Sequence, residues 1–157
     1  MTGFLGEYRA TVDNKGRLRI PAGVKKQLSP EANGRLVINR GFEDCLVLYP
    51  MNEWEQITKK LAALNRFRKE DREFIRTFLR GATIVELDDN DRINIPNHLL
   101  AFADIKGEMV ISAQQDIIEL WSVQKYDEQM KVDSDRYADL AEKVLGGKKE
   151  DGSGSSE

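Results

Sequence analysis

The stretch DNKGRLRIP, residues 13–21, places three cationic side chains within five residues. Lys15, Arg17 and Arg19 suit the binding of an anion, because lysine and arginine neutralise phosphate groups and arginine can also form two hydrogen bonds to a guanine edge. A β-hairpin is thin enough to lie along a groove of double-stranded DNA. Cations nearby in the sequence extend this candidate site. Its residues are Lys15, Arg17, Arg19, Arg9, Lys25 and Lys26.

The distribution of charge is compatible with an anionic partner but does not decide the matter. Residues 1–80 hold 16 Lys/Arg against 10 Asp/Glu, whereas residues 81–157 hold 8 against 17, so the net charge of −3 averages a basic half and an acidic half. Such asymmetry is a recognised sign that one half binds an anion. A dipolar surface used for head-to-tail self-association explains it equally well. A basic hairpin can also be a solvated edge on which lysine prevents aggregation.

The motif occurs a second time as DDNDRINIP, residues 88–96, which repeats Asp-x-x-x-Arg-x-x-Ile-Pro. Here Asp89 and Asp91 would repel phosphate. An aspartate and an arginine that recur in opposite surroundings favour a structural role, in which the carboxylate accepts hydrogen bonds from turn amides or pairs with the guanidinium. We therefore expect the first copy to bind DNA and the second to support it. The residues assigned to the structural motif are Asp13, Gly16, Pro21, Asp88, Arg92 and Pro96.

The repeat extends beyond the motif to about 50 residues per copy, with an insertion between the copies. Each copy predicts the order strand, strand, short helix, strand, strand, helix. A copy with four short strands can hardly bury a core of its own, whereas two copies that pair can close a small barrel together. The matching segments are 6–12 with 81–87, 34–38 with 107–111, and 46–56 with 118–128.

Local patterns place the first motif between two strands. Residues 8–12 alternate as a half-buried strand does, and residues 13–16 have the composition of a turn. Leu18 and Ile20 then share one face of the next strand, with the arginines on the other face. Pro21 ends this strand and can sit in the first turn of a helix. A short helix is predicted at 21–28, and two further strands at 35–39 and 45–49.

The spacing of apolar residues predicts three further helices. The first opens at a capping box made by Asn52 and Glu55. The second is the insertion, residues 69–81, whose arginines either face solvent or meet acidic parts of a neighbouring chain. The third begins at residue 134 and ends at Gly146, before a polar tail that we expect to be disordered. The apolar faces are Trp54, Ile57, Leu61 and Leu64; Phe74, Ile75, Phe78 and Leu79; and Tyr137, Leu140, Ala141, Val144 and Leu145, and the arginines are Arg72, Arg76 and Arg80.

Residue types give little support to an enzyme or a metal protein. His98 is the only histidine and Cys45 the only cysteine, so the chain has neither a zinc site of ordinary spacing nor an internal disulfide. No glycine-rich phosphate loop occurs, and we expect no catalytic residue, metal, cofactor or small-molecule substrate. The carboxylates at 88–91 suit a divalent cation, although acidic turns are usually only hydrated.

The sequence also predicts a compartment. The start MTGFLGEYRA has neither the basic nor the apolar region of a secretory signal, and no run of 18 apolar residues occurs. A single cysteine fits a reducing environment. We therefore expect a cytoplasmic protein without a membrane partner.

VDNKGRLRIP resembles the signature of the AbrB-like swapped-hairpin DNA-binding fold. The second copy, with LYPMNEW after the first and ELW after the second, is similar to the MraZ family of bacterial transcriptional regulators over residues 4–145. The resemblance implies an α+β fold, a swapped-hairpin β-barrel formed by two tandem AbrB-like repeats as a pseudo-dimer with flanking helices. The expected segments are a first repeat at 4–57, an inserted helical segment at 58–80, a second repeat at 81–131, a C-terminal helix at 132–146 and a disordered tail at 147–157.

The resemblance also implies a function. Members assemble into homo-oligomeric rings, bind short repeated G-containing DNA sites upstream of their own division and cell-wall operon, and generally repress it, which implies association with the nucleoid. The first Asp-x-Lys-Gly-Arg of the family falls on Asp13, Lys15, Gly16 and Arg17, and Arg17 corresponds to the DNA-contacting arginine. The second signature usually has glycine where this chain has Asp91, which weakens a DNA-reading role for Arg92. An antitoxin-like module of the same fold, whose main partner is another protein, is the alternative.

Overall fold

The structure, a computed structural model, describes residues 3–146. The chain divides into two compact units, Met1–Lys125 and Tyr126–Glu157. The first unit contains both copies of the motif, and the second contains the C-terminal helix. The predicted disordered tail at 147–157 lies outside the described residues. Within the described residues, no helix combines the length and apolar character needed to cross a membrane.

The strands and helices of the first unit follow the order that the repeat predicts. In each copy a short helix follows the second strand and a longer helix follows the fourth. The strands are β1 (Phe4–Thr11), β2 (Arg17–Arg19), β3 (Arg35–Arg40), β4 (Leu46–Pro50), β5 (Thr83–Glu86), β6 (Arg92–Asn94), β7 (Glu108–Gln115) and β8 (Ile117–Ser122). The helices are α1 (Ala22–Lys25), the 3-10 turn η1 (Pro30–Ala32), α2 (Met51–Ala62), α3 (Lys69–Leu79), α4 (Asn97–Phe102) and α5 (Val123–Gln129), which ends in the second unit.

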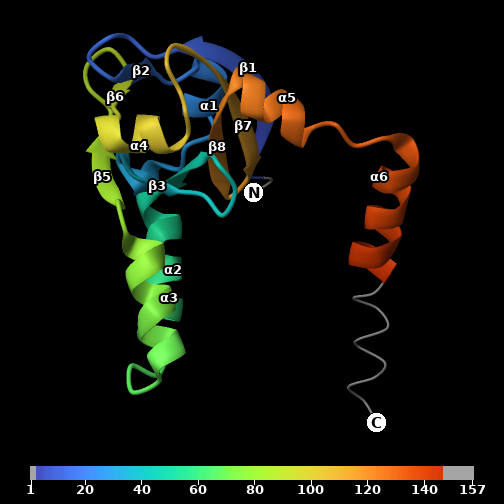
Figure 1. Ribbon diagram of the computed structural model, residues 1–157. Helices are drawn as coiled ribbons and strands as arrows, with labels where there is room; N and C mark the ends of the chain where they lie inside the picture. Colours follow the sequence, from blue (N-terminus) through green and yellow to red (C-terminus); the bar gives the residue numbers. More distant parts are fainter. Residues whose placement is uncertain (1–2, 147–157) are drawn as a thin grey trace. The chain divides into compact units, whose positions relative to one another are not determined.

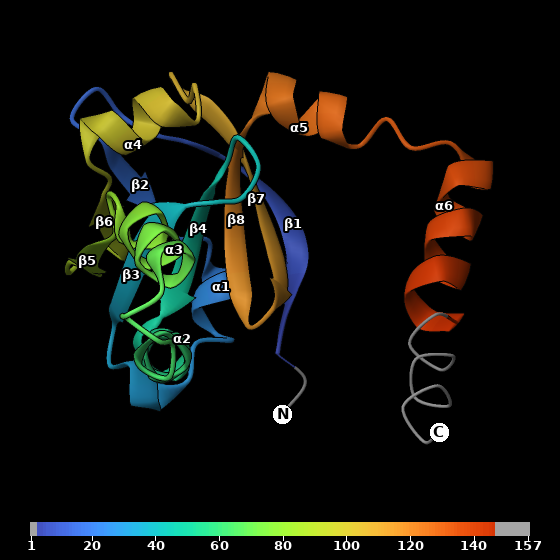
Figure 2. The same ribbon diagram turned by 60° about the horizontal axis from the view of Figure 1, so that its bottom comes forward.

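Each strand of the first copy pairs with a strand of the second copy, and every pair is antiparallel. β1 pairs with β7, β3 with β5, and β4 with β8, and the pairs β3–β4 and β7–β8 complete a six-stranded sheet in the order β1-β7-β8-β4-β3-β5. β2 and β6 form a separate two-stranded sheet. Figures 1 and 2 show early and late segments side by side, for instance β1 next to β7. The two copies are therefore interleaved in one α+β fold.

The described strands do not close a hydrogen-bonded barrel. β1 and β5 are the two edges of the larger sheet and do not pair with each other. Near its start, the edge of β1 is covered by a side chain: Gln27 accepts a hydrogen bond from the Leu5 N–H at 2.8 Å and donates one to the Leu5 carbonyl at 3.1 Å. The side-chain amide thus takes the place of a neighbouring strand. The closed barrel and the swapped-hairpin topology stay predictions.

The two strands that flank the basic turn do not pair with each other as the arms of a simple β-hairpin do. The Asp13 N–H donates to the Arg17 carbonyl at 3.0 Å and closes the turn, after which β1 continues with β7 and β2 with β6. Alternation along a strand shows which face is buried but not which strand lies beside it. Both strands pair instead with strands of the other copy, β1 with β7 and β2 with β6.

A single hydrophobic core is built from equivalent positions of the two copies. Leu18 and Ile93 are directly opposite each other and are 0% and 1% exposed. Ile20 is 4% exposed, which confirms the predicted inner face, and Cys45 is buried as expected for a small core residue. Equivalent core pairs are Leu18 with Ile93, Ile20 with Ile95, Val24 with Leu99, Leu36 with Met109, Ile38 with Ile111, Leu46 with Ile118, and Leu48 with Leu120.

Prolines mark the starts of three helices. Pro21, Pro50 and Pro96 are the N-cap residues of α1, α2 and α4, with φ of −56°, −55° and −57°. Pro21 therefore lies just before its helix and not inside the first turn. The predicted capping box of Asn52 and Glu55 is wrong, because α2 begins directly after Pro50 and has no side-chain cap. The fixed φ of proline sets the entry of the chain into each helix.

α2 and α3 contact each other through aromatic rings, but the apolar face of α3 is only partly covered. Trp54 and Phe78 stack with ring centroids 5.8 Å apart. Ile75 is 4% exposed, as predicted. Phe74 and Leu79 were expected to pack inward, yet they are 44% and 39% exposed. A single neighbouring helix covers only one stripe of α3, so residues on the flanks of that stripe remain in solvent.

The described part of the second unit contains the C-terminal helix α6 (Ser134–Ala141), which continues as the π-helical turn η2 (Glu142–Gly146). Asp133 caps α6 by accepting a hydrogen bond from the Arg136 N–H at 2.8 Å. The predicted helical spacing of apolar residues is present, but Tyr137 and Leu145 are 71% and 73% exposed. Within the described part of this unit, nothing covers this apolar face. A capping role for Gly146 stays a prediction, because the next residues lie outside the described range.

Candidate nucleic-acid interface

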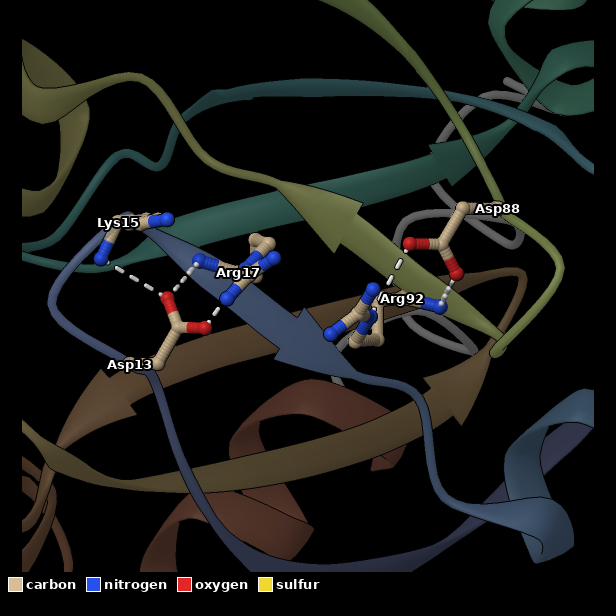
Figure 3. Close-up of polar contacts among 5 residues, drawn as sticks. All are labelled: Asp13, Lys15, Arg17, Asp88 and Arg92. Carbon is tan, nitrogen blue, oxygen red and sulfur yellow. Dashed lines mark hydrogen bonds and ion pairs between the residues drawn. The ribbon is translucent and has the colours of Figure 1, made fainter.

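Asp13 organises the first turn by accepting three hydrogen bonds (Figure 3). Its Oδ1 accepts from the backbone N–H groups of Lys15 and Arg17, each at 2.9 Å, and its Oδ2 accepts from the Nε–H of Arg17 at 2.7 Å. The Gly16 N–H donates to the Asp13 carbonyl at 3.0 Å. One carboxylate thus fixes both the turn and the guanidinium that follows it.

Asp88 builds the second turn in the same way. Its Oδ1 accepts from the N–H groups of Asn90 at 2.8 Å and Arg92 at 2.9 Å, and its Oδ2 accepts from the Arg92 Nε–H at 3.1 Å. The Asp91 N–H donates to the Asp88 carbonyl at 3.0 Å. The two turns are equivalent although their surroundings differ in charge, so the geometry depends on the aspartate and arginine themselves.

Backbone hydrogen bonds join each turn to the other copy. The Ile95 N–H donates to the Gly16 carbonyl at 2.7 Å, and the Ile20 N–H donates to the Asp91 carbonyl at 2.8 Å. Gly16 and Asp91 hold equivalent left-handed positions, with φ of 82° and 60°. A Cβ at Gly16 would lie 2.7 Å from the Ile95 carbonyl oxygen, so this position requires glycine. Aspartate tolerates the left-handed region better than most residues, which explains Asp91.

The β2–β6 sheet brings three arginines onto one outer surface. The register pairs Arg17 with Asn94, Leu18 with Ile93, and Arg19 with Arg92. Directly opposite residues share a face. Leu18 and Ile93 point into the core, so the residues on either side of them in each strand point outward. We call this outer surface the arginine face, which consists of Arg17, Arg19, Arg92 and Asn94.

The arginine face carries an electrostatic conflict. Arg19 and Arg92 are like charges in directly opposite positions, which destabilises a strand pair. Asp13 and Asp88 offset part of this charge. The hydrogen bond from the Arg17 backbone N–H is the main reason that the pKa of Asp13 lies below its usual 3.8, and the Arg92 N–H has the same effect on the pKa of Asp88. Both carboxylates are therefore ionised at neutral pH.

Two more predicted cations lie near the first motif without a carboxylate partner among the described residues. Lys15 occupies the tip of the turn and is exposed, and its backbone N–H binds Asp13. Lys26 is exposed directly after α1. Lys15 thus lies in the turn just before Arg17, and Lys26 lies beyond the proline that follows β2.

The other two predicted cations are engaged in ion pairs. The Nζ of Lys25 lies 2.7 Å from Oδ1 of Asp91, so this lysine of the first copy is tied to the second turn. Arg9 lies on β1 in the larger sheet, where its Nη1 is 3.5 Å from Oε1 of Glu108 on β7. The structure therefore brings Lys25 to the turns but leaves Arg9 on a different sheet from the arginine face.

The structure also adds Arg92 to the candidate interface. Its acidic neighbours suggested only a structural role, yet the register places it opposite Arg19. The duplicated motif was the available signal, because two copies that pair around a common axis bring equivalent segments together. The sequence did not reveal which residues would be opposite, since a shift of one position turns every side chain to the other face.

The residues considered for catalysis or metal binding, Cys45 and His98, are not part of the arginine face. Cys45 is 1% exposed, and burial raises the pKa of its thiol to about 12, so it is protonated at neutral pH. His98 is exposed on α4 and lines a hollow of about 330 Å³ with Arg40, Arg80 and Phe102. Within residues 3–146, no group of three or more His, Cys, Asp or Glu side chains is placed to hold a metal ion.

Comparison with known proteins relates almost the whole chain to one family. The family model described as "MraZ protein, putative antitoxin-like" matches residues 4–77 and again residues 78–145. A "Transcriptional regulator MraZ" of Christiangramia forsetii is 44% identical over 153 residues, which cover 97% of this chain and 99% of the relative. Proteins of the same name from Flavobacterium psychrophilum and Cytophaga hutchinsonii are 40% and 42% identical, covering 99% and 90% of this chain and 100% and 94% of the relatives. The two successive matches agree with the repeated order of strands.

Substituting Gly16 by alanine should destabilise the protein by about 1–3 kcal/mol, because alanine adds a Cβ against the Ile95 carbonyl at a left-handed position. The free energy of unfolding in urea measures the effect. Gly107→Ala is the matched control, since a Cβ at Gly107 meets no atom within 4 Å. Equal effects of the two substitutions would show that the first turn relaxes around a side chain.

Substituting Asp13 by asparagine should lower stability at neutral pH but have little effect in strong acid. The folded-state pKa of Asp13 lies below 3.8, so the stability that its ionised form contributes is present above pH 3.8 and is lost as the pH falls through the lowered pKa. Urea unfolding of wild type and variant at neutral pH and well below 3.8 measures this. Asp89→Asn controls for loss of a nearby charge. A deficit of the same size at both pH values would contradict the prediction.

Proposed function

The chain belongs to the MraZ family, and on this basis we propose that it is a DNA-binding transcriptional regulator that contacts DNA through the arginine face. The observation that carries the proposal is the position of Arg19 directly opposite Arg92, beside Arg17. Three permanent positive charges on one side of a short strand pair cost stability in the free protein. A polyanion bound to this face removes that cost.

The shape of the β2–β6 sheet suits a DNA groove. A two-stranded antiparallel ribbon fits the major groove of B-DNA, and its outward side chains reach the base edges. Leu18 and Ile93 anchor the ribbon to the core, so the arginines are presented on a fixed support. A rigid support of this kind lowers the entropy lost on binding.

Asp13 and Asp88 prepare their arginines for recognition. Each carboxylate accepts a hydrogen bond from the Nε–H of its arginine. The two terminal nitrogen atoms of the guanidinium take no part in this hydrogen bond. The terminal N–H groups are the ones that form paired hydrogen bonds with O6 and N7 of guanine or with phosphate oxygens. Arg17 and Arg92 then read bases or phosphates, and Lys15 adds a phosphate contact at the tip of the turn. Lys26 extends the positive field without being part of the arginine face, whereas the charge of Arg9 is offset by Glu108.

The finer parts of the proposal come from the resemblance of the motif to the family. We propose that the DNA sites are short G-containing repeats upstream of the protein's own division and cell-wall operon, and that binding there represses the operon. The protein would then be found with the nucleoid in the cytoplasm. No cofactor, metal, small-molecule substrate or catalytic step is part of this proposal.

Self-association into a ring explains how a chain with a net charge of −3 can bind DNA firmly. One arginine face makes few phosphate contacts. Several faces on a ring bind repeated sites together, and each contact after the first benefits from a high effective concentration. The spacing of the DNA repeats must then match the spacing of the subunits.

Substituting Arg17, Arg19 or Arg92 by alanine should each weaken binding to the upstream DNA by about 1–3 kcal/mol, since each removes contacts to bases or phosphates. Fluorescence anisotropy with a labelled upstream fragment, repeated across a salt titration, measures the affinity and the number of phosphate contacts. The purified chain is used without a partner protein, which separates DNA binding from an antitoxin-like role that depends on one.

Arg66→Ala is the matched control for this experiment, because it removes one positive charge in the turn between α2 and α3. It should leave affinity unchanged. Loss of binding with Arg17→Ala and Arg19→Ala but not with Arg92→Ala would show that only the first copy contacts DNA. No binding by the wild type at low salt would reject the proposed function.

Substituting Asp91 by asparagine should tighten DNA binding a few-fold and steepen its dependence on salt. The change releases Lys25 from its 2.7 Å ion pair, so that Lys25 becomes available to a phosphate. Asparagine also tolerates the left-handed backbone at this position. The same anisotropy titration measures both effects.

Asp89→Asn is the control, because it removes the same charge from the same turn without touching Lys25. Equal gains in the two variants would mean that net charge alone matters. No gain with Asp91→Asn would place Lys25 outside the DNA contact.

A further inference from the structure

An aromatic patch on the first unit is exposed to solvent and encloses a hollow. Phe78 contacts Phe74 with ring centroids 5.7 Å apart and Phe42 at 6.3 Å. Phe42 is 83% exposed and Phe74 44% exposed. Between them lies a hollow of about 180 Å³, which is also lined by Arg40 and Thr77. Three aromatic rings around an open hollow are typical of a surface that another molecule covers.

The C-terminal helix carries an exposed apolar stripe of its own. On α6 and η2, the residues Tyr137, Val144 and Leu145 are 71%, 62% and 73% exposed, and they follow the spacing that lines up one helical face. A helix with an uncovered apolar stripe buries that stripe against a hollow in another surface, where its side chains act as anchors.

The charges around the two surfaces are opposite in sign. Residues 66–80, which include α3, hold six basic residues against three acidic ones, whereas residues 126–146 hold six acidic against three basic. Within residues 3–146, Arg76 and Arg80 on the one side, and Asp139 and Glu142 on the other, are in no ion pair. Complementary charge at the rim steers association and disfavours wrong partners.

We infer that the α6–η2 helix of one chain docks on the aromatic patch of a second copy of the same chain. Tyr137, Val144 and Leu145 then cover the rings of Phe42, Phe74 and Phe78. Acidic residues of the helix lie over the arginines of α3. The inference rests on the self-association that is part of the proposed function and assigns the surfaces that carry it.

This contact joins two different surfaces, so it is heterologous. Each chain offers one helix and one patch, and a chain whose helix is docked still has its own patch available. Heterologous contacts close into rings when the rotation between neighbours divides a full turn, and otherwise extend as filaments. The arrangement also leaves the arginine face, which lies on β2 and β6, outside the contact.

The first test is the mass of the full chain by size-exclusion chromatography with light scattering, as a function of concentration. Phe42→Ser and Leu145→Ser should each weaken association about tenfold or more, because each removes an anchor from one side of the contact. Phe67→Ser and Met130→Ser are matched controls, since these side chains are 95% and 60% exposed but lie outside both surfaces. The controls should keep the wild-type mass.

A second test does not depend on disrupting the assembly. A Thr77→Cys chain is mixed with a Leu145→Cys chain and treated with a short bismaleimide. The native Cys45 does not interfere, because it is buried and its thiol is protonated. A cross-linked pair of chains should form in this mixture and should be absent when Phe67→Cys replaces Thr77→Cys.

The outcomes distinguish the assigned contact surfaces from self-association itself. An oligomeric wild type whose mass is unchanged in both Phe42→Ser and Leu145→Ser, with no selective cross-link, overturns the assigned surfaces and leaves self-association standing. A wild type that is monomeric at every concentration overturns self-association as well. DNA binding by that monomer would still support the arginine face.

Discussion

The pairing of β2 with β6 is the contact on which the rest of the molecule depends, although it involves only three residues on each side. Its inner face contributes Leu18 and Ile93 to the core. At its ends, the turn carbonyls of Gly16 and Asp91 accept hydrogen bonds from the opposite copy. A shift of one residue would turn both core side chains to solvent and the arginines inward. The same pairing therefore fixes the core, the turns and the arginine face together.

The two copies keep one backbone and differ in the chemistry they present. Asp13 and Asp88 accept equivalent sets of hydrogen bonds, so the turns do not depend on the charge of their neighbours. Gly16 and Asp91 hold equivalent left-handed positions, yet only Asp91 carries a side chain that holds Lys25. In a symmetric dimer every substitution appears in both halves. Fusion into one chain allows the second copy to become acidic while the first remains basic.

Much of this arrangement could be predicted from the sequence, and the failures have identifiable causes. The repeat, the order of elements and the buried face of Leu18 and Ile20 followed from local periodicity and turn chemistry. The partner of each strand could not be predicted in this way, because the alternation of side chains carries no information about which strand lies beside another. The Asn52 capping box failed because Pro50 already sets the entry into α2. The exposure of Phe74 depends on how much of α3 the neighbouring helix covers, which spacing alone does not reveal.

The candidate site was predicted in part for the same reasons. Lys15, Arg17 and Arg19 stand out by composition, whereas the contribution of Arg92 depends on a register between segments 75 positions apart in the sequence. Ion pairs that occupy Arg9 and Lys25 depend on tertiary contacts with Glu108 and Asp91. Short-range patterns thus indicated that the surface is cationic, and the long-range pairing of strands determined which residues form it.

The interleaving of the copies also affects how the protein is made. β1 is among the first segments to leave the ribosome, but its partner β7 is complete only at residue 115. Pairing between segments so distant in sequence is slow to form and leaves strand edges open in the meantime. The Gln27 amide belongs to the same copy as Leu5, so its hydrogen bonds to Leu5 involve no residue of the second copy. The first copy therefore supplies the partner for this part of the β1 edge itself, whereas the strand that pairs with β1 comes from the second copy.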